Sequence, residues 1–350
     1  MPQPEKIDQR DAAERIREGE SFPQVTTDPI LEVRQLCVEF RISDQILRAV
    51  DNVSFQVPQQ STVGLVGESG SGKTLTALSI LNLPPAGARI TAGSILFRGR
   101  DVLQMTYREL RHIRGKEIAL IFQEPMSSLN PVLSIRTQLT EGMLAHLDIS
   151  RADATRRAVQ LLQQVGISDP ERRLREYPHQ LSGGMRQRVM IAMALACEPS
   201  LLIADEPTTA LDVTIQAQIL DLLRDLKQKY RLSMLLISHD LGIVAQNADW
   251  VAVMYAGRIV EFASCRDLFH HPQHPYTQAL LRAVPRLDRK SDRLEAVPGS
   301  VPSLRAIPPG CSFHPRCPEM IPDCTPAVPE LRKVGPDHWA RCIRRAPYAG

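Results

Sequence analysis

The sequence predicts an α/β protein built on a parallel β-sheet with helices on both faces. Three continuously apolar segments, Thr62–Gly67, Ser200–Ala204 and Ser233–Ile237, have the length of strands that are buried on both faces. Helical patterns follow the first segment at about 72–81 and separate the other two near 214–229. Strands that alternate with helices form parallel sheets, because each return to the same sheet edge needs a crossover connection.

The other elements are predicted from the same kinds of pattern. Residues 30–40 alternate like a strand with one slip of phase, residues 50–57 are a second strand candidate, and residue 94 begins a third. Residues 133–196 are mostly helical by periodicity. Residues 1–28 mix acidic and basic side chains and are predicted to be a polar tail.

The composition is that of a globular chain. Of its 350 residues, 43% are hydrophobic and 23% are charged, which is enough to bury a large core. The formal net charge of +3 is too small for an electrostatic grip of the whole protein on nucleic acid. No apolar run approaches the ~18 residues that span a bilayer, and the N-terminal segment has no secretory signal. We therefore expect a cytosolic protein whose seven cysteines are mostly thiols or metal ligands.

A phosphate-binding loop lies between the first apolar strand and its helix. The residues GESGSGKT, from Gly67 to Thr74, fit the pattern G-x-x-x-x-G-K-[ST]. Glycines let backbone N–H groups curl around phosphates, and the following helix adds the positive end of its dipole. Lys73 then reaches the β- and γ-phosphates, and the Thr74 hydroxyl binds Mg²⁺. The candidate nucleotide-binding residues here are Gly67, Ser69, Gly70, Ser71, Gly72, Lys73, Thr74 and Leu75.

Two acids end the apolar strand that begins at Ser200. Asp205 is expected to bind Mg²⁺ through its hydration shell, and Glu206 to polarise the attacking water as a general base. Two acids at a strand end often form only a solvated turn, but the upstream phosphate loop favours catalysis. Upstream of them, Ser182 begins a Ser-Gly-Gly turn before a helix, where its hydroxyl and the next two amides form an anion-facing helix start.

This order of motifs resembles that of the ABC ATPases, and the resemblance covers most of the chain. The turn formed by Ser182, Gly183 and Gly184 is similar to the signature loop of that family. Further positions match family motifs in the expected order: the Q-loop glutamine Gln123, the D-loop segment Ala210-Leu211-Asp212, the switch histidine His239 and, for stacking on adenine, Phe40.

The resemblance implies an ABC-type P-loop ATPase fold. Residues 29–284 would form its nucleotide-binding domain, with a RecA-like core, an antiparallel β subdomain and a helical subdomain at about 133–196. The implied ligands are ATP and Mg²⁺, with the metal held by Thr74, Gln123 and Asp205.

The resemblance also implies how the subunits cooperate. ATP sites of this family lie between two subunits that face head to tail, so that Ser182, Gly183, Gly184 and Asp212 of one subunit meet the nucleotide of the other. Glu206, His239 and Gln123 are then the catalytic residues. The chain is therefore expected to need a second ABC ATPase subunit, either identical or a paralogue, to hydrolyse ATP.

A second set of residues resembles one subfamily. Residues 271–277 (HPQHPYT) are similar to the H-P-Y-T element that ends the core of peptide-importer ATPases, and residues 123–131 and 212–214 also match that group. The resemblance implies ATP-driven uptake of dipeptides or oligopeptides, while relatives in the group carry nickel, glutathione or antimicrobial peptides. A soluble ABC ATPase is the alternative, but such proteins usually have two fused cassettes or a long coiled coil.

The implied partners follow from the absence of membrane-spanning runs in this sequence. An importer ATPase must dock on separate subunits, here two transmembrane permeases, which receive substrate from an extracytoplasmic solute-binding protein. We expect the dock to be a groove bordered by the Q-loop and the helical region after it. The implied location is peripheral, on the cytoplasmic face of the bacterial inner membrane, with no nucleic acid bound.

The composition changes after about Val284. Residues 285–350 hold twelve of the 27 prolines and four of the seven cysteines. Such a segment buries little apolar surface of its own, so we expect something other than a hydrophobic core to hold it in place. We also expect the segment to lie far from the phosphate loop.

The four cysteines of this extension are spaced C-x5-C-x6-C-x17-C, at Cys311, Cys317, Cys324 and Cys342. The spacing leaves a [4Fe–4S] cluster, zinc and unliganded thiols open, although zinc sites usually contain closer cysteine pairs. Some members of the peptide-importer subfamily hold a [4Fe–4S] cluster in a similar proline-rich region. The resemblance therefore implies such a cluster here, with zinc as the alternative metal.

Overall fold

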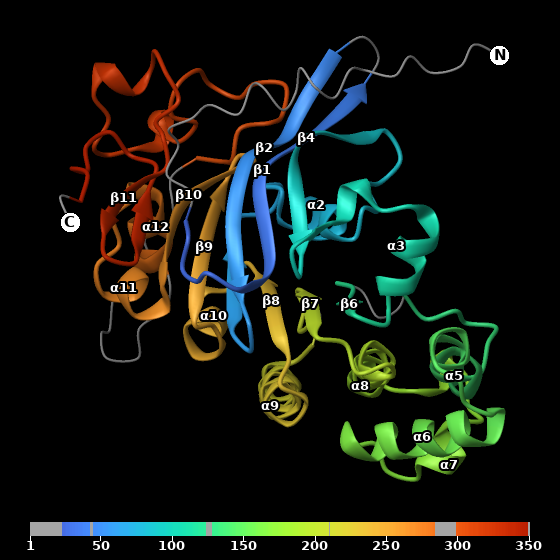
Figure 1. The fold of residues 1–350 in the computed structure, drawn as a ribbon. Helices are drawn as coiled ribbons and strands as arrows, with labels where there is room; N and C mark the ends of the chain where they lie inside the picture. Colours follow the sequence, from blue (N-terminus) through green and yellow to red (C-terminus); the bar gives the residue numbers. More distant parts are fainter. Residues whose placement is uncertain (1–22, 43–44, 124–127, 210, 284–298, 349–350) are drawn as a thin grey trace.

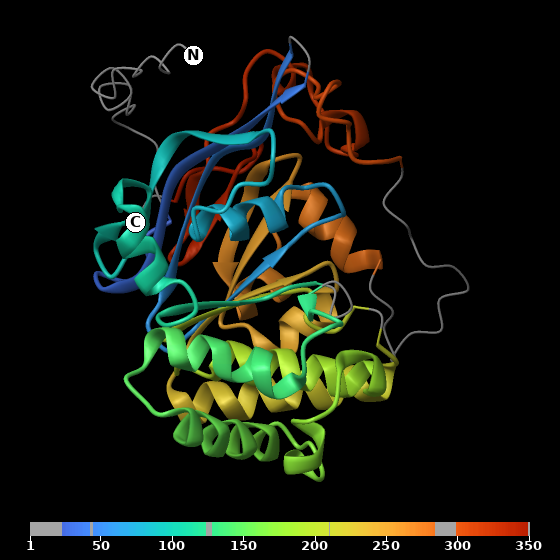
Figure 2. The same ribbon diagram turned by 90° about the vertical axis from the view of Figure 1, so that its right-hand side faces the viewer.

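The computed structural model describes residues 23–42, 45–123, 128–209, 211–283 and 299–348. They form layers, with an eight-stranded sheet in the middle (Figures 1 and 2). A four-stranded sheet and some of the helices pack on one face of this central sheet, and other helices pack on the opposite face. The predicted α/β class is confirmed. Most of the predicted N-terminal tail, 1–28, lies outside the described residues.

The four-stranded sheet is antiparallel, in the order β2-β1-β4-β5. β1 contains the slip of phase that the sequence shows, because its register with β2 shifts between Val33 and Leu36. Gln35 lies in this irregularity with a left-handed φ of 48°, so that Val33 and Leu36 are both buried. The strands are β1 (Pro29–Ile42), β2 (Gln45–Pro58), β4 (Ala88–Phe97) and β5 (Arg100–Asp101).

The central sheet has the order β11-β12-β10-β9-β3-β8-β7-β6. The five strands from β9 to β6 are parallel, as predicted, and every residue of β3, β7 and β8 is buried. The edge beyond β9 is antiparallel, so the sheet is mixed. These strands are β3 (Thr62–Val66), β6 (Ile118–Ile121), β7 (Leu201–Asp205), β8 (Ser233–Ser238), β9 (Trp250–Tyr255) and β10 (Arg258–Ser264).

The helices divide between the two faces of the central sheet. α2 shares a core with the antiparallel sheet, whereas α5, α6, α8 and α9 share one with the opposite face. Among the described residues, none of the helices has the length and apolarity to span a bilayer. The helices are α2 (Lys73–Ile80), α3 (Tyr107–Ile113), α5 (Ile135–His146), α6 (Arg151–Gln164), α7 (Pro170–Arg173), α8 (Gly183–Leu195), α9 (Val213–Tyr230), α10 (Leu241–Asn247), α11 (Cys265–His270) and α12 (Pro275–Ala283).

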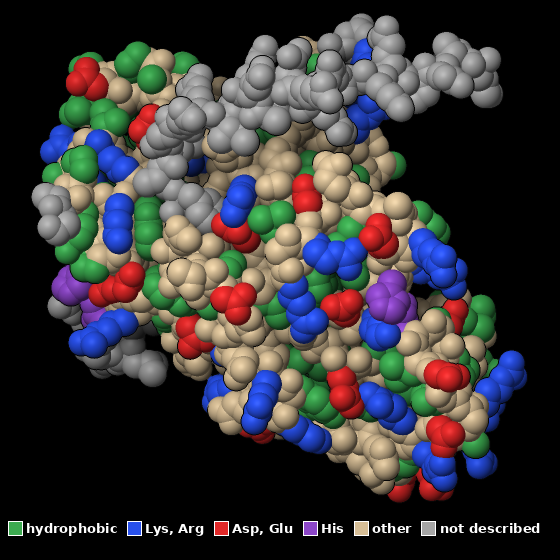
Figure 3. Space-filling view, in the orientation of Figure 1, with side chains coloured by type: hydrophobic (Ala, Val, Ile, Leu, Met, Phe, Trp, Pro, Cys, Tyr) green, Lys and Arg blue, Asp and Glu red, His purple; other side chains and the backbone are tan. Residues whose placement is uncertain are grey.

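The helices α5 to α8 lie within residues 133–196, the region that the sequence analysis expects to be mostly helical. These helices form a separate lobe below the central sheet in Figure 1. On the face shown in Figure 3, basic and acidic side chains of the described residues are interspersed over this lobe.

The C-terminal extension is fixed differently from what the sequence led us to expect. Its strands β11 (Arg332–Gly335) and β12 (His338–Ala340) extend the central sheet, with β12 paired to β10. Trp339 is buried in the core against Phe262, and Phe313 is buried against Tyr255 and Tyr276. The expectation that no core fixes this segment is therefore wrong, because its few aromatic residues enter cores built by the rest of the chain.

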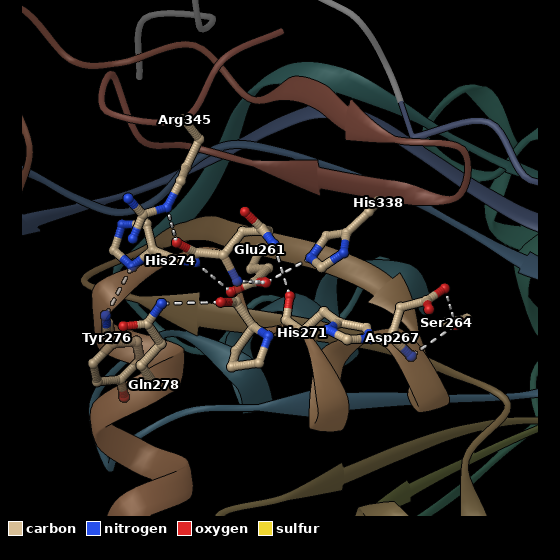
Figure 4. Close-up of polar contacts among 11 residues, drawn as sticks. Glu261, Ser264, Asp267, His271, His274, Tyr276, Gln278, His338 and Arg345 are labelled. Atoms are coloured by element: carbon tan, nitrogen blue, oxygen red, sulfur yellow. Dashed lines mark hydrogen bonds and ion pairs between the residues drawn. The ribbon is translucent and has the colours of Figure 1, made fainter. Parts of the chain in front are cut away.

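A buried carboxylate fastens the extension to β10 (Figure 4). Glu261 on β10 is fully buried and accepts hydrogen bonds from the backbone N–H groups of Gln273 and His274, at 2.6 and 2.8 Å. Its Oε1 also lies 2.6 Å from Nε2 of His338 on β12. Arg345 donates to the carbonyl of Gln273. One carboxylate therefore joins β10, the turn before α12 and the last strand.

We predict that Glu261→Ala lowers the free energy of unfolding by about 3–5 kcal/mol, because it leaves the buried N–H of His274, the partly buried N–H of Gln273 and the buried His338 ring without their acceptor. Chemical denaturation of the full chain measures this change. Glu330→Ala removes an exposed carboxylate of the same extension and should change stability by less than about 0.5 kcal/mol. Equal effects of the two substitutions would contradict the anchoring role of Glu261.

Candidate functional site

The phosphate loop connects the carboxyl end of β3 to the start of α2. At two of its glycines the surrounding backbone leaves no space for a side chain. A Cβ on Gly67 would lie 2.1 Å from the carbonyl oxygen of Met254 on β9. Gly72 has a φ of +103°, and a Cβ there would lie 2.9 Å from the carbonyl oxygen of Ala49. The backbone can therefore close into a loop only with glycine at these positions. Ser69 and Gly70 at its tip are exposed.

Lys73 points back into this loop. Its Nζ donates to the carbonyl oxygens of Gly67 and Glu68, at 2.8 and 3.1 Å, and the side chain is buried. Burial lowers the pKa of the Lys73 amine, against the opposing fields of Glu206, Asp205 and Glu68. The amine is therefore held at the centre of the loop, where a bound phosphate would meet it.

The acid pair lies beside this amine at the end of β7. Burial raises the pKa of Asp205, although its carboxylate accepts a hydrogen bond from the exposed Thr74. Two buried oxygens near the loop, Oδ1 of Asp205 and Oγ of Ser71, have no hydrogen-bond partner within the described part of the chain. A buried carboxylate oxygen without a partner is costly, so this donor set of carboxylate and hydroxyl oxygens fits Mg²⁺.

Glu206 is the meeting point of three polar side chains. Its Oε2 accepts from Gln123 Nε2 at 3.0 Å and from Thr209 Oγ1 at 2.8 Å, and lies 3.2 Å from His239 Nδ1. Burial raises the pKa of this carboxyl, but the bonds with Thr209 and His239 outweigh it and lower the pKa below its ordinary value. The structure therefore brings Gln123, Glu206 and His239 together, and Thr209 is a member that the sequence did not single out.

Glu206 is also held in an unusual backbone conformation. Its φ is 46°, in the left-handed region, and its backbone N–H donates to the carbonyl oxygen of Ile237 at 3.0 Å. Such conformations are rare for residues other than glycine and cluster at functional sites. The bend after β7 turns the Glu206 side chain toward Gln123 and His239 while Asp205 remains buried.

The Ser-Gly-Gly turn is exposed at the start of α8. The Ser182 hydroxyl caps this helix by accepting from Met185 N–H at 3.3 Å, and Gly183 is exposed. A Cβ on Gly184 would lie 3.1 Å from the side chain of Ile215 near the start of α9. Asp212 caps α9 and is exposed as well. Two helix N-termini therefore lie side by side at the surface.

The structure describes some predicted positions only in part. Phe40 on β1 is partly buried and packs against the core beneath the antiparallel sheet. Its predicted contact with adenine stays a prediction. Ala210 of the predicted D-loop and residues 124–127 after Gln123 lie outside the described residues.

The comparisons with known proteins agree with this geometry. The family model described as "ABC transporter" matches residues 50–209. A probable peptide ABC transporter ATP-binding protein of Sinorhizobium fredii is 52% identical over 91% of this chain and 95% of its own. The chain belongs to the ATP-binding proteins of the ABC transporter family. A second model, "Oligopeptide/dipeptide transporter, C-terminal region", matches residues 260–324 of this ABC ATPase.

Other relatives carry similar descriptions. The oligopeptide transport ATP-binding protein AppD of Bacillus subtilis is 51% identical over 90% of this chain and 96% of its own. The solved structure of the ATP-binding cassette MJ0796, dimeric and bound to ADP and Pi, matches with a TM-score of 0.61 and 25% identity. That match covers 67% of this ABC ATPase and 99% of the solved chain. The predicted ABC fold and the resemblance to peptide-transporter ATPases are confirmed.

The four cysteines of the extension gather around one small cavity. Cys311, Cys317, Cys324 and Cys342 all line it, together with His274 and His314 among other residues. Burial, with a contribution from Cys311 and Cys342, raises the pKa of the Cys317 thiol to about 11. Within the residues that the structure describes, no three His, Cys, Asp or Glu side chains are arranged to hold one metal ion.

The two candidate metals would require different spacings of the four sulfurs. Zinc binds four thiolates at about 2.3 Å, which brings the sulfurs within about 4 Å of one another. In a [4Fe–4S] cluster the thiolates bind separate irons and stand farther apart. The structure brings the four cysteines to one cavity, and both the cluster and zinc stay predictions.

The sequence also missed two residues that reach the phosphate loop. Tyr276 of the HPQHPYT segment accepts the backbone N–H of Glu68 at 3.0 Å. Arg316 of the extension forms two hydrogen bonds to the Glu68 carboxylate, at 2.8 and 3.1 Å. The expectation that the extension lies far from the loop is therefore wrong. The H-P-Y-T motif gave a signal for Tyr276, whereas no pattern around Arg316 predicts its contact.

We predict that Asp205→Asn stabilises the protein without nucleotide by about 1 kcal/mol at neutral pH, because it removes a poorly compensated buried charge. The pKa of the Asp205 carboxyl is raised in the folded state. The carboxyl therefore lowers the stability of the protein at pH values above the pKa that it has in the unfolded chain. The difference in stability between Asp205→Asn and wild type should therefore vanish in acid, where the carboxyl is protonated in both the folded and the unfolded state. Thermal unfolding at several pH values measures it.

The matched control for this substitution is Asp225→Asn, which changes an exposed carboxylate on α9. It should leave stability unchanged at every pH. If Asp205→Asn proves less stable than wild type at neutral pH, the carboxylate is compensated by contacts that this explanation omits.

Proposed function

We propose that this chain is the ATP-hydrolysing subunit of an importer that takes dipeptides or oligopeptides across the cytoplasmic membrane. The observation that carries the proposal is the convergence of Lys73, the acid pair and His239 at one end of the central sheet. The peptide substrate is inferred from the relatives' descriptions and from the match at residues 260–324.

In this proposal each residue has a defined task. Lys73 and the N–H groups of residues 67–75 hold the phosphates of ATP, and Phe40 stacks on adenine. Thr74, Asp205 and Gln123 hold Mg²⁺, which neutralises charge on the phosphates when bound. Glu206, kept ionised by its low pKa, accepts a proton from the attacking water, while His239 and Gln123 fix its orientation.

A dimer completes each site in this proposal. Ser182, Gly183 and Asp212 are exposed at the surface. An exposed helix N-terminus binds anions, so the start of α8 is suited to the γ-phosphate of a nucleotide on the second subunit. The solved relative MJ0796 is dimeric, which supports this arrangement. We propose a paralogue as the second ATPase, as is common among peptide importers.

The same proposal includes two membrane permeases and an extracytoplasmic solute-binding protein. A surface hollow of about 690 Å³ lies between Pro131 and Val132 on one side and residues 172–180, at and after α7, on the other. Val132 and Tyr177 line it and expose 76% and 40% of their surface. Exposed apolar side chains in a hollow are suited to receive a segment of another protein. This is the surface where we propose that a permease docks, on the cytoplasmic face.

We predict that Glu206→Gln lowers ATP hydrolysis at this site by about 10²–10⁴-fold while ATP binding is kept, because the base is lost and the phosphate contacts stay. The variant should accumulate an ATP-bound dimer of the nucleotide-binding subunits. Single-turnover hydrolysis and light scattering measure the two effects in the assembled transporter.

Two further variants separate the roles. Ser182→Arg in the Glu206→Gln background should abolish the ATP-bound dimer and leave the nucleotide affinity of the isolated subunit unchanged. Lys73→Ala should instead weaken nucleotide binding itself. Hydrolysis by Glu206→Gln within a few-fold of wild type would show that Glu206 is not the base.

We also propose that the cavity formed by Cys311, Cys317, Cys324 and Cys342 holds a [4Fe–4S] cluster with a structural role. Four thiols that line one cavity support this proposal, as does the resemblance to importer ATPases that hold such a cluster in a similar region. Bound iron would replace the protons on these thiols, since metal-bound thiols are deprotonated.

We predict that protein purified without oxygen is brown and contains about four irons per chain. Cys317→Ser or Cys324→Ser should remove the colour and make the extension more sensitive to proteases. Cys265→Ser changes a partly buried cysteine on α11 and should keep both iron and colour. Stoichiometric zinc without iron, or four thiols that all react with an alkylating agent, would rule the cluster out.

A further inference from the structure

An arginine of the C-terminal extension is built into the phosphate loop. Arg316 donates from Nη1 to Oε2 of Glu68 at 2.8 Å and from Nη2 to Oε1 at 3.1 Å. Its side chain is 6% exposed, and that of Glu68 is 29% exposed. Two parallel hydrogen bonds between a guanidinium and a carboxylate fix the geometry of both groups.

The aromatic cluster beneath the loop determines where the guanidinium lies. Arg316 stacks over the rings of Tyr255 and Phe313, with its Cζ 5.7 and 5.8 Å from their centroids. It also contacts the Tyr255 hydroxyl at 3.4 Å and the carbonyl oxygen of Gly299 at 3.4 Å. Because Tyr255 belongs to β9 and Phe313 to the extension, the guanidinium contacts both the central sheet and the extension.

Glu68 connects this arginine to the residue that meets the phosphates. The backbone carbonyl of Glu68 accepts a hydrogen bond from Lys73 Nζ. The Glu68 carboxylate also stabilises the protonated form of the same amine, and so acts to raise its pKa against the effect of burial. The backbone N–H of Glu68 is held by Tyr276. A carboxylate at this position would repel the phosphates of a nucleotide unless a cation neutralised it.

We propose that Arg316 is a positioning residue of the nucleotide site. It neutralises Glu68 and fixes the loop in the shape that receives a nucleoside triphosphate, so the C-terminal extension sets nucleotide affinity. This inference rests on the proposed ATPase function. Arg316 directly precedes Cys317, so any change at the four-cysteine cavity that moves the turn Phe313–Cys317 also moves the guanidinium.

A double-mutant cycle on the full chain tests the proposal. Arg316→Gln should weaken binding of a fluorescent ATP analogue by about tenfold, because it leaves the Glu68 carboxylate without its cation. In the Glu68→Gln background, Arg316→Gln should weaken binding of the same analogue by less than about threefold, since residue 68 then has no charge to neutralise. In the assembled transporter, Arg316→Gln should raise KM for ATP and leave kcat within about twofold, because Glu206 is untouched.

The matched control is Arg305→Gln, which changes an exposed arginine of the same extension and should leave nucleotide affinity unchanged. Wild-type affinity in Arg316→Gln, or an equal loss in both Glu68 backgrounds, would overturn the proposal.

If Arg316→Gln does not fold, Arg316→Lys keeps the charge and loses the two-point contact. It should weaken binding by about threefold, and unchanged affinity would again overturn the proposal. Failure of the wild-type protein to bind ATP would refute the proposed function instead.

Discussion

The parallel pairing of β3, β8 and β7 is the constraint on which the site depends. Val66 is paired with Ser238, and Ile237 with Asp205, so the carboxyl ends of the three strands meet at one edge. The phosphate loop, the acid pair and His239 each follow one of these strands. Ligands of open α/β sheets bind at this edge for the same reason. The surrounding helices and the antiparallel sheet bury the strands on both faces and so hold this register.

The two adjacent acids show how one strand end supplies two different environments. Asp205 continues β7 and stays buried, and burial raises its pKa. Glu206 leaves the strand through a left-handed turn into a set of polar side chains, and its pKa is lowered. Titratable neighbours whose environments push their pKa values in opposite directions are suited to different tasks, here cation binding and proton acceptance.

Most of the site could be predicted because its motifs are local. The phosphate loop, the acid pair and the Ser-Gly-Gly turn are each a few consecutive residues whose strand or helix context is visible in the sequence. The contact between Arg316 and Glu68 could not be predicted, because it joins residues 248 positions apart by a pairing with no repeated pattern. β12 was missed for a related reason, since three residues beside prolines carry no strand periodicity.

The position of β12 at the edge of the central sheet has a consequence during synthesis. β10 ends at Ser264, and its partner strand begins at His338, so the ribosome adds more than seventy residues between them. At ordinary elongation rates this takes about 4–15 s. Throughout that interval β10 can pair with β9 but its other edge stays open, and the ring of Phe262 lacks the cover of Trp339. An open edge of this kind can pair with another chain, so the addition of β12 also closes a site where neighbouring nascent chains could associate.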